Sequence, residues 1–265
     1  MRTPETLRSW SNPLVQRARA AQAGREPGVL ALEGARLVRD ALAAGLGLEL
    51  ALVDAARPER FADVLAAARE ARLVEGALLA RLSSLDTAPG VLALAACPPV
   101  RPLAALDLAA RAPEAAAGLA LGVAGIGDPG NLGALARSAE AAGARGLVVA
   151  RGGARPFGPK ALRGSMGSLL RLPVHEVDDL GAALAELTAR GVRQAVASLA
   201  GGTPYTRFDF SGPFVLWLPG EVGEAGTALA GLPRVCIPMA GAVESLNVTV
   251  AGSLLLFAAG RAPRE

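Results

Sequence analysis

The chain has 265 residues, of which 52% are hydrophobic and 3% aromatic, and a formal net charge of +3. This length fits one large domain or two small ones, with a core of Ala, Leu and Val that needs no disulfide. Cys97 and Cys236 follow no metal-ligand spacing and His175 is the only histidine, so we expect reduced thiols and no metal site. No apolar run is long enough to span a membrane and the N-terminus lacks a signal-peptide core, which predicts a cytoplasmic protein without a membrane partner.

Positive charge is concentrated in two segments of the sequence. Residues 1–26 hold five Arg against two acidic residues, and residues 131–171 hold six Arg and the only lysine, Lys160, against Glu140 alone. Local basic clusters on a chain with a pI of about 9.5 favour a polyanionic partner such as nucleic acid. Charge alone leaves an ordinary solvated surface as the alternative.

The N-terminal 97 residues alternate between helical and strand-like patterns. Such alternation predicts a small α/β domain over residues 1–97. We expect helices at 4–24, 33–44, 58–71 and 78–82, and strands at 28–32, 48–53 and 91–96.

Residues 98–117 are rich in Pro and Ala and predict an interdomain linker. A second α/β domain follows over residues 118–265. We expect strands at 119–126, 146–150, 172–177, 193–199, 213–218 and 234–238, and helices at 131–142, 160–168, 178–190, 224–230 and 245–259.

The first motif of this second domain opens its first helix. Asn131 follows Asp128-Pro129-Gly130 and is a natural N-cap, and Arg137 lies six residues later on another side of the helix. The preceding Gly125-Ile126-Gly127-Asp128-Pro129-Gly130 also matches a dinucleotide-binding GxGxxG, which leaves an NADP-dependent oxidoreductase as a remote alternative. Pro129 speaks against it, because proline removes an N–H donor from the phosphate turn.

The second and third motifs are loops that follow strands. Phe214-Val215-Leu216-Trp217-Leu218 runs into Pro219-Gly220-Glu221, a Gly-containing loop with a carboxylate, which is typical of a backbone-lined ligand pocket. The segment Cys236 to Asn247 contains one Pro and one Gly and feeds an apolar helix, whose first N–H groups are free to face a ligand. The alternative interpretation of the second motif is a surface turn between a strand and a helix.

Together these motifs resemble the SpoU/TrmH family of RNA ribose 2′-O-methyltransferases. Asn131-x-Gly133-x-x-x-Arg137-x-Ala139 and Ile237-Pro-Met239-x-Gly241-x-x-x-Ser245-Leu-Asn247-Val-Thr-Val-Ala251 match the family's first and third motifs. Pro219 departs from the second motif, where the family has Gly. The N-terminal segment is also similar to the family's small substrate-binding domain, which is related to ribosomal RNA-binding proteins.

The resemblance implies an α/β fold with a parallel sheet and a deep trefoil knot, a homodimer that builds its site across the interface, and S-adenosylmethionine as cofactor. It implies catalytic roles for Asn131, Arg137, Glu221, Ser245 and Asn247, and cofactor contacts from Leu218, Gly220, Ile237, Met239, Gly241, Ser245 and Leu246. The basic residues expected to contact RNA are Arg17, Arg19, Arg36, Arg151, Arg155, Lys160 and Arg163.

The separate N-terminal domain favours 23S ribosomal RNA as the substrate. A tRNA methyltransferase and a non-catalytic RNA-binding protein of the same fold remain alternatives.

Overall fold

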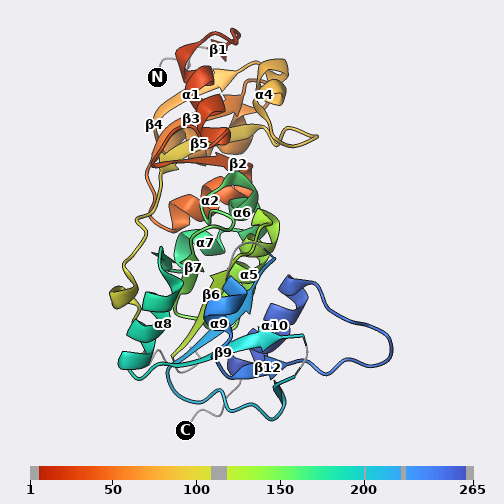
Figure 1. Cartoon of the computed structure of the whole chain (residues 1–265). Helices are drawn as coiled ribbons and strands as arrows, with labels where there is room; N and C mark the ends of the chain where they lie inside the picture. The colour runs from red at the N-terminus through yellow and green to blue at the C-terminus, as the bar shows by residue number, and fades with distance from the viewer. Residues whose placement is uncertain (1–5, 109–117, 200, 222–224, 261–265) are drawn as a thin grey trace. The chain divides into compact units, whose positions relative to one another are not determined.

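The computed structural model describes residues 6–108, 118–199, 201–221 and 225–260 (Figure 1). The chain divides into two compact units. Unit 1 comprises Met1–Pro99 with Phe157–Leu170, and unit 2 comprises Val100–Pro156 with Arg171–Glu265. The segment 157–170, which lies more than 50 residues after Pro99 in the sequence, therefore packs with the N-terminal residues.

Unit 1 contains a five-stranded sheet with the strand order β1-β4-β3-β5-β2. Strand β5 is antiparallel to β2 and β3, whereas β1, β4 and β3 are parallel to one another. Its elements are β1 (Thr6–Leu7), α1 (Pro13–Gln22), β2 (Val29–Glu33), α2 (Ala35–Ala43), β3 (Leu48–Asp54), η1 (Pro58–Phe61), α3 (Ala62–Ala67), β4 (Ala68–Val74), α4 (Gly76–Leu82), β5 (Val91–Ala96) and α6 (Pro159–Ser165).

Two helices predicted for this unit are shorter in the structure. Helix α1 begins at Pro13, because Asn12 accepts the Leu14 N–H at 2.9 Å and proline fits the first helical position. The helix predicted over 58–71 is wrong in its last four residues. Residues 68–74 form β4, where pairing with β1 and β3 and burial of Leu73 and Val74 override the helical preference of the preceding Ala-rich residues.

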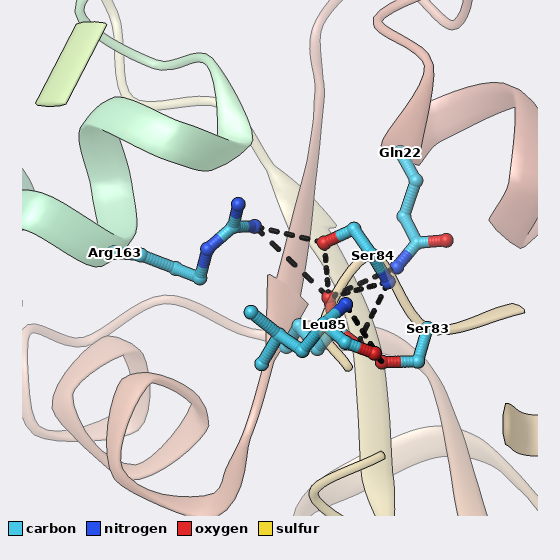
Figure 2. A network of polar contacts seen from close by, with 6 residues as sticks. Gln22, Ser83, Ser84, Leu85 and Arg163 are labelled. Atoms are coloured by element: carbon cyan, nitrogen blue, oxygen red, sulfur yellow. Dashed lines mark hydrogen bonds and ion pairs between the residues drawn. The ribbon is translucent and has the colours of Figure 1, made fainter. Parts of the chain in front are cut away.

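A buried carboxylate joins three parts of unit 1 (Figure 2). Glu33, at the end of β2, is 7% exposed. It accepts hydrogen bonds from the Ser83 hydroxyl at 2.5 Å, from the Ser84 hydroxyl at 2.6 Å, and from the Ser84 N–H. Gln22 of α1 donates at 3.3 Å, and Arg163 of α6 forms an ion pair at 4.0 Å. This network, named here the Glu33 network, satisfies a charge that burial would otherwise make costly.

Unit 2 contains a seven-stranded parallel sheet with the strand order β10-β12-β9-β11-β6-β7-β8. Helix α7 (Ser168–Arg171) spans the boundary between the units. The other elements are η2 (Leu103–Ala105), β6 (Leu119–Ala124), α5 (Pro129–Ala141), β7 (Leu147–Ala150), β8 (Val174–Val177), α8 (Leu180–Ala189), β9 (Arg193–Ser198), β10 (Thr203–Pro204), β11 (Phe214–Pro219), α9 (Ala225–Leu229), β12 (Arg234–Cys236) and α10 (Val248–Gly260).

Both faces of this sheet are covered, as the continuous apolar sequence of its central strands requires. Trp217 and Val215 of β11 face one core cluster, which includes Leu187 of α8. Successive strand residues point to opposite faces, so Leu218 faces the other side, where α5 and α10 pack. Gly252 of α10 permits this close packing, because a Cβ there would lie 2.5 Å from Leu135 and Leu218.

The first part of the predicted linker lies against unit 2. Leu103, Leu106 and Leu108 are buried. Arg190 donates to the carbonyl oxygens of Leu103 and Leu106, and His175 Nδ1 lies 2.9 Å from the Pro102 carbonyl oxygen. Residues 109–117 of the linker lie outside the described residues.

Candidate active site

A pocket of unit 2 lies where parallel-sheet topology predicts a ligand. From β6 the chain proceeds to β7 and β8 on one side, whereas β11 and β9 lie on the other side. Ligands of open α/β sheets bind beyond the carboxyl ends of the strands at such a reversal of strand order. The pocket, of about 820 Å³, is lined there by residues that follow β6, β9, β11 and β12.

Most of the predicted site residues meet in this pocket. The residues predicted to be catalytic or to contact the cofactor that line it are Asn131, Leu218, Gly220, Glu221, Ile237, Met239, Ser245, Leu246 and Asn247. Arg137 and Gly241 are not among its lining residues. Three motifs that are far apart in the sequence are therefore brought together, and one predicted catalytic side chain lies outside the cavity of this chain.

Two asparagines are tied together through Thr249. The Asn247 side-chain oxygen accepts the Thr249 N–H at 2.8 Å and so caps α10, and its carbonyl oxygen accepts the Ala251 N–H at 3.0 Å. The Thr249 hydroxyl donates to the Asn131 side-chain oxygen at 3.1 Å. Each amide oxygen accepts one of these hydrogen bonds, which orients the side chain, and the NH₂ group of each Asn can donate to a ligand.

The caps of the two helices at the pocket differ from the prediction by a few residues. Asp128, rather than Asn131, caps α5, since its carboxylate accepts the Asn131 N–H at 2.9 Å and Pro129 occupies the first helical position. The last helix begins at Val248 instead of 245, which leaves Ser245 and Leu246 in the loop that lines the pocket.

Gly220 allows the loops after β6 and β11 to touch. Its N–H donates to the Ala124 carbonyl oxygen at 2.7 Å, and a Cβ at this position would lie 2.0 Å from the Gly125 carbonyl oxygen. The resulting wall is backbone, which suits contacts to the edges of a heterocyclic ring. Glu221 follows as an exposed carboxylate, and residues 222–224 of the predicted loop lie outside the described residues.

Arg137 lies on an exposed side of α5, one and a half turns after Asn131. At about 100° per residue, six residues place its side chain on another side of the helix. Arg137, which is predicted to act on the RNA, therefore points in a different direction from the residues that are predicted to contact the cofactor.

The predicted RNA-binding side chains have different surroundings. Arg17 forms ion pairs with Glu26 at 2.7 Å and Glu49 at 2.5 Å, and hydrogen bonds to both carboxylates raise its pKa. Arg151 pairs with Asp178 at 2.8 Å, and Arg163 belongs to the Glu33 network. Exposed positions are held by Arg19, Arg36, Arg155 and Lys160.

One wall of the pocket was not predicted. Ala197, Ser198 and Leu199 line it from the carboxyl end of β9. These residues belong to no motif. The sequence indicated only that the strand predicted over 193–199 would end at the same edge of a parallel sheet as the motif loops.

Across the described segments, no group of three or more His, Cys, Asp or Glu side chains is arranged to hold a metal ion. In those same segments no helix has the length and hydropathy needed to cross a membrane.

The sequence model of the SpoU rRNA Methylase family matches residues 118–257. The chain belongs to this family. That result decides against the NADP-dependent oxidoreductase alternative, and the GxGxxG match at residues 125–130 is the turn into α5.

Similar proteins span the whole chain as well as its C-terminal half. An uncharacterized tRNA/rRNA methyltransferase of Synechocystis is 32% identical over 97% of this chain and 93% of that protein. A 23S rRNA (guanosine-2′-O) methyltransferase of Bacillus subtilis is 36% identical, but the match covers 50% of this chain and about half, 54%, of that protein. A crystal structure of an AdoMet-bound rRNA methyltransferase from Sinorhizobium meliloti has a TM-score of 0.81 at 26% identity, with 97% of both chains covered.

Proposed function

We propose that the chain transfers a methyl group from S-adenosylmethionine to a ribose 2′-hydroxyl of 23S ribosomal RNA. The observation that carries this proposal is the convergence of the three motifs on one pocket at the reversal of strand order. Support for the substrate comes from the names of the relatives, which include a 23S rRNA 2′-O-methyltransferase. Because the proposed substrate is ribosomal RNA, we also propose that the protein is cytoplasmic.

The pocket fits the cofactor. Its volume of about 820 Å³ suits a nucleoside joined to an amino acid, and the backbone around Gly220, Ile237 and Leu246 offers polar groups to a base and to an amino-acid moiety. We assign cofactor contacts to the predicted residues that line the pocket, Leu218, Gly220, Ile237, Met239, Ser245 and Leu246, and assign none to Gly241. When bound, S-adenosylmethionine supplies a methyl group on a cationic sulfur, and the exposed carboxylate of Glu221 favours such a charge.

The remaining catalytic roles follow from donor chemistry. The NH₂ groups of Asn131 and Asn247, together with the Ser245 hydroxyl, orient the ribose at the mouth of the pocket. Arg137 binds the adjacent phosphate and stabilises the negative charge that develops on the ribose oxygen. A guanidinium stays protonated at neutral pH, so Arg137 would not take up the hydroxyl proton, which would pass to water, and a neutral thioether would be the leaving group.

A second copy of the chain completes the proposed site. Val250, Leu254 and Phe257 follow one another at i, i+4 and i+7 on α10 and are 49%, 42% and 41% exposed. Such a stripe on a helix predicts an interface, and α10 packs against α5, which carries Arg137. In a homodimer through this face, the Arg137 of one copy serves the pocket of the other.

The trefoil knot is part of the same proposal. Support comes from the chain path, because β12 pairs with β9 and β10, whereas α10, which follows it, packs against α5, β6 and β11. The joining segment 237–247 lines the pocket next to the loop after β11. Unit 1 is proposed to bind the RNA substrate.

The test is transfer of labelled methyl from S-adenosylmethionine to unmodified 23S ribosomal RNA and, separately, to tRNA. We expect label in the ribosomal RNA, at one alkali-resistant linkage, and about 100-fold less with Arg137→Ala. Label in tRNA alone would overturn the substrate. No label, combined with no affinity for S-adenosylmethionine, would leave a non-catalytic RNA-binding protein of the same fold.

A further inference from the structure

A tryptophan with two arginines over its ring forms a separate cluster in unit 1. Trp10 lies between β1 and α1 and is half-buried against the core of the unit. The Arg19 guanidinium lies 5.4 Å from the centre of its ring, and the Arg81 guanidinium lies 4.3 Å from it. Arg19 comes from α1 and Arg81 from the last turn of α4, and these helices pack together (Figure 1).

The two arginines of the cluster have no acidic partner among the described residues, unlike several other arginines of unit 1. Arg17 is held by Glu26 and Glu49, and Arg39 donates to both oxygens of Asp63. Within the described ranges, Arg19 and Arg81 form no ion pair. Both are exposed, and the guanidinium carbon of each lies over the Trp10 ring, a contact that occupies none of the N–H groups in an ion pair.

Such an arrangement has a defined chemical use. Stacking on an indole fixes the plane of a guanidinium but leaves its N–H groups at the edge, where they match the oxygens of a phosphate. The outer face of a guanidinium is also a surface on which an unpaired base stacks. Ion pairs within the protein would compete with both contacts, and here they are absent within the described ranges.

We infer that Trp10, Arg19 and Arg81 form a docking site for a strand of the RNA substrate, with the two guanidinium groups on successive phosphates or on a phosphate and a base. The inference rests on the proposed function and adds to it a place on unit 1 where the RNA binds. Trp10 acts as a positioning residue for the two arginines. Arg17, two residues from Arg19 on the same helix, is assigned to folding rather than to RNA.

The test compares two double variants of the full chain. Arg19→Gln with Arg81→Gln removes the docking charges, whereas Arg57→Gln with Arg69→Gln removes two exposed arginines elsewhere in unit 1 and matches the change in net charge. Affinity for an in vitro transcript of 23S ribosomal RNA is measured at several KCl concentrations. We expect the first pair to raise Kd about tenfold and to lower the slope of log affinity against log salt by one to two units.

Equal effects of the two pairs would overturn the docking site, even if the wild-type chain methylates the RNA. Conversely, a loss confined to the first pair would support the site even if no methyl transfer occurs, so the two proposals fail separately. Trp10→Leu keeps an apolar side chain and is expected to weaken RNA binding in the same direction. Affinity for S-adenosylmethionine should be unchanged in every variant, and a loss of that affinity would indicate misfolding instead of lost docking.

Discussion

At the scale of single residues, Gly220 decides how closely two loops approach. A side chain there would meet the Gly125 carbonyl oxygen at 2.0 Å, and backbone cannot move aside as a flexible side chain does. Gly220→Ala is therefore expected to open the pocket wall and to weaken S-adenosylmethionine binding at least tenfold, measured by calorimetry. Gly226→Ala is the control, because its Cβ meets nothing within 4 Å. Equal affinities of the two variants would mean that the wall does not contact the cofactor.

Arg137 allows a test that separates binding from chemistry. It lies outside the pocket lining, so Arg137→Ala should leave the Kd for S-adenosylmethionine within about twofold of wild type while lowering kcat about 100-fold. Arg137→Lys retains a cation and should keep the shape of the pH–rate profile. A profile whose limb shifts in Arg137→Lys would instead identify Arg137 as the titrating group.

At the scale of elements, the segment before β6 is attached to β8 through His175 and to the end of α8 through Arg190. Burial lowers the pKa of His175 below its usual 6.5, and nearby Arg101 and Arg190 lower it further. The unfolded chain therefore binds a proton that the folded chain resists, so the contribution of His175 to stability is complete above pH 6.5 and declines as the pH falls below it.

The prediction for this element concerns stability against pH. His175→Asn retains a donor for the Pro102 carbonyl oxygen but carries no titratable group. The variant is expected to be less stable than wild type at pH 7.5, with a difference that shrinks towards pH 5, measured by urea unfolding. A difference that is constant over this range would show that the protonation of His175 is not linked to folding.

The Glu33 network makes a second prediction at this scale. Glu33→Gln exchanges an acceptor for a donor facing the Ser84 N–H, and we expect a loss of about 1–3 kcal/mol in the free energy of unfolding. Arg163 is more exposed and its ion pair is longer, so Arg163→Ala is expected to cost less than about 1 kcal/mol. Chemical denaturation measures the loss of stability in both variants. A larger loss in Arg163→Ala than in Glu33→Gln would show that Arg163 contributes more to the stability of the network than Glu33 does.

An element can be predicted from the sequence when the residues that determine it lie close to it along the chain. Asn12, Pro13 and Gly45 act within one turn, so helix ends near them are accessible to local reasoning. Strand β4 is not, because its state is set by pairing with β1 and β3, which lie elsewhere in the sequence. The packing of α6 with β2 also depends on residues far apart in the sequence, and no local sequence pattern predicts it.

The residues of the site could be predicted from the sequence more completely than the fold, for a geometric reason. Loops after parallel strands gather at one edge of a sheet, so residues identified by motif in separate loops were bound to meet. Arg137 is the exception, because the direction of its side chain depends on the rotation of α5 about its axis. Thr249, which links Asn131 to Asn247, was hidden because its hydroxyl acts across 118 residues of sequence.

At the scale of the whole molecule, the exposed stripe on α10 predicts the oligomeric state. Leu254→Asp with Phe257→Asp places two carboxylates in the proposed interface, where their desolvation is costly. We expect this variant to be monomeric in sedimentation experiments and inactive in methyl transfer. Val100→Asp, which changes an equally exposed apolar residue elsewhere, should remain dimeric. A dimer in both variants would remove α10 from the interface.

The packing of Phe157–Leu170 with the N-terminal residues limits how such a chain can be rearranged. Unit 1 is built from two separate stretches, so a fragment that ends at Pro99 lacks α6 and leaves Glu33 without Arg163. A gene fusion that transplants residues 1–99 would carry an incomplete domain, with apolar surface that Ala161 and Leu162 normally help to bury. Recombination at the boundary near residue 99 would therefore not transfer a complete unit 1, whereas point substitutions within unit 1 would leave both of its stretches in place.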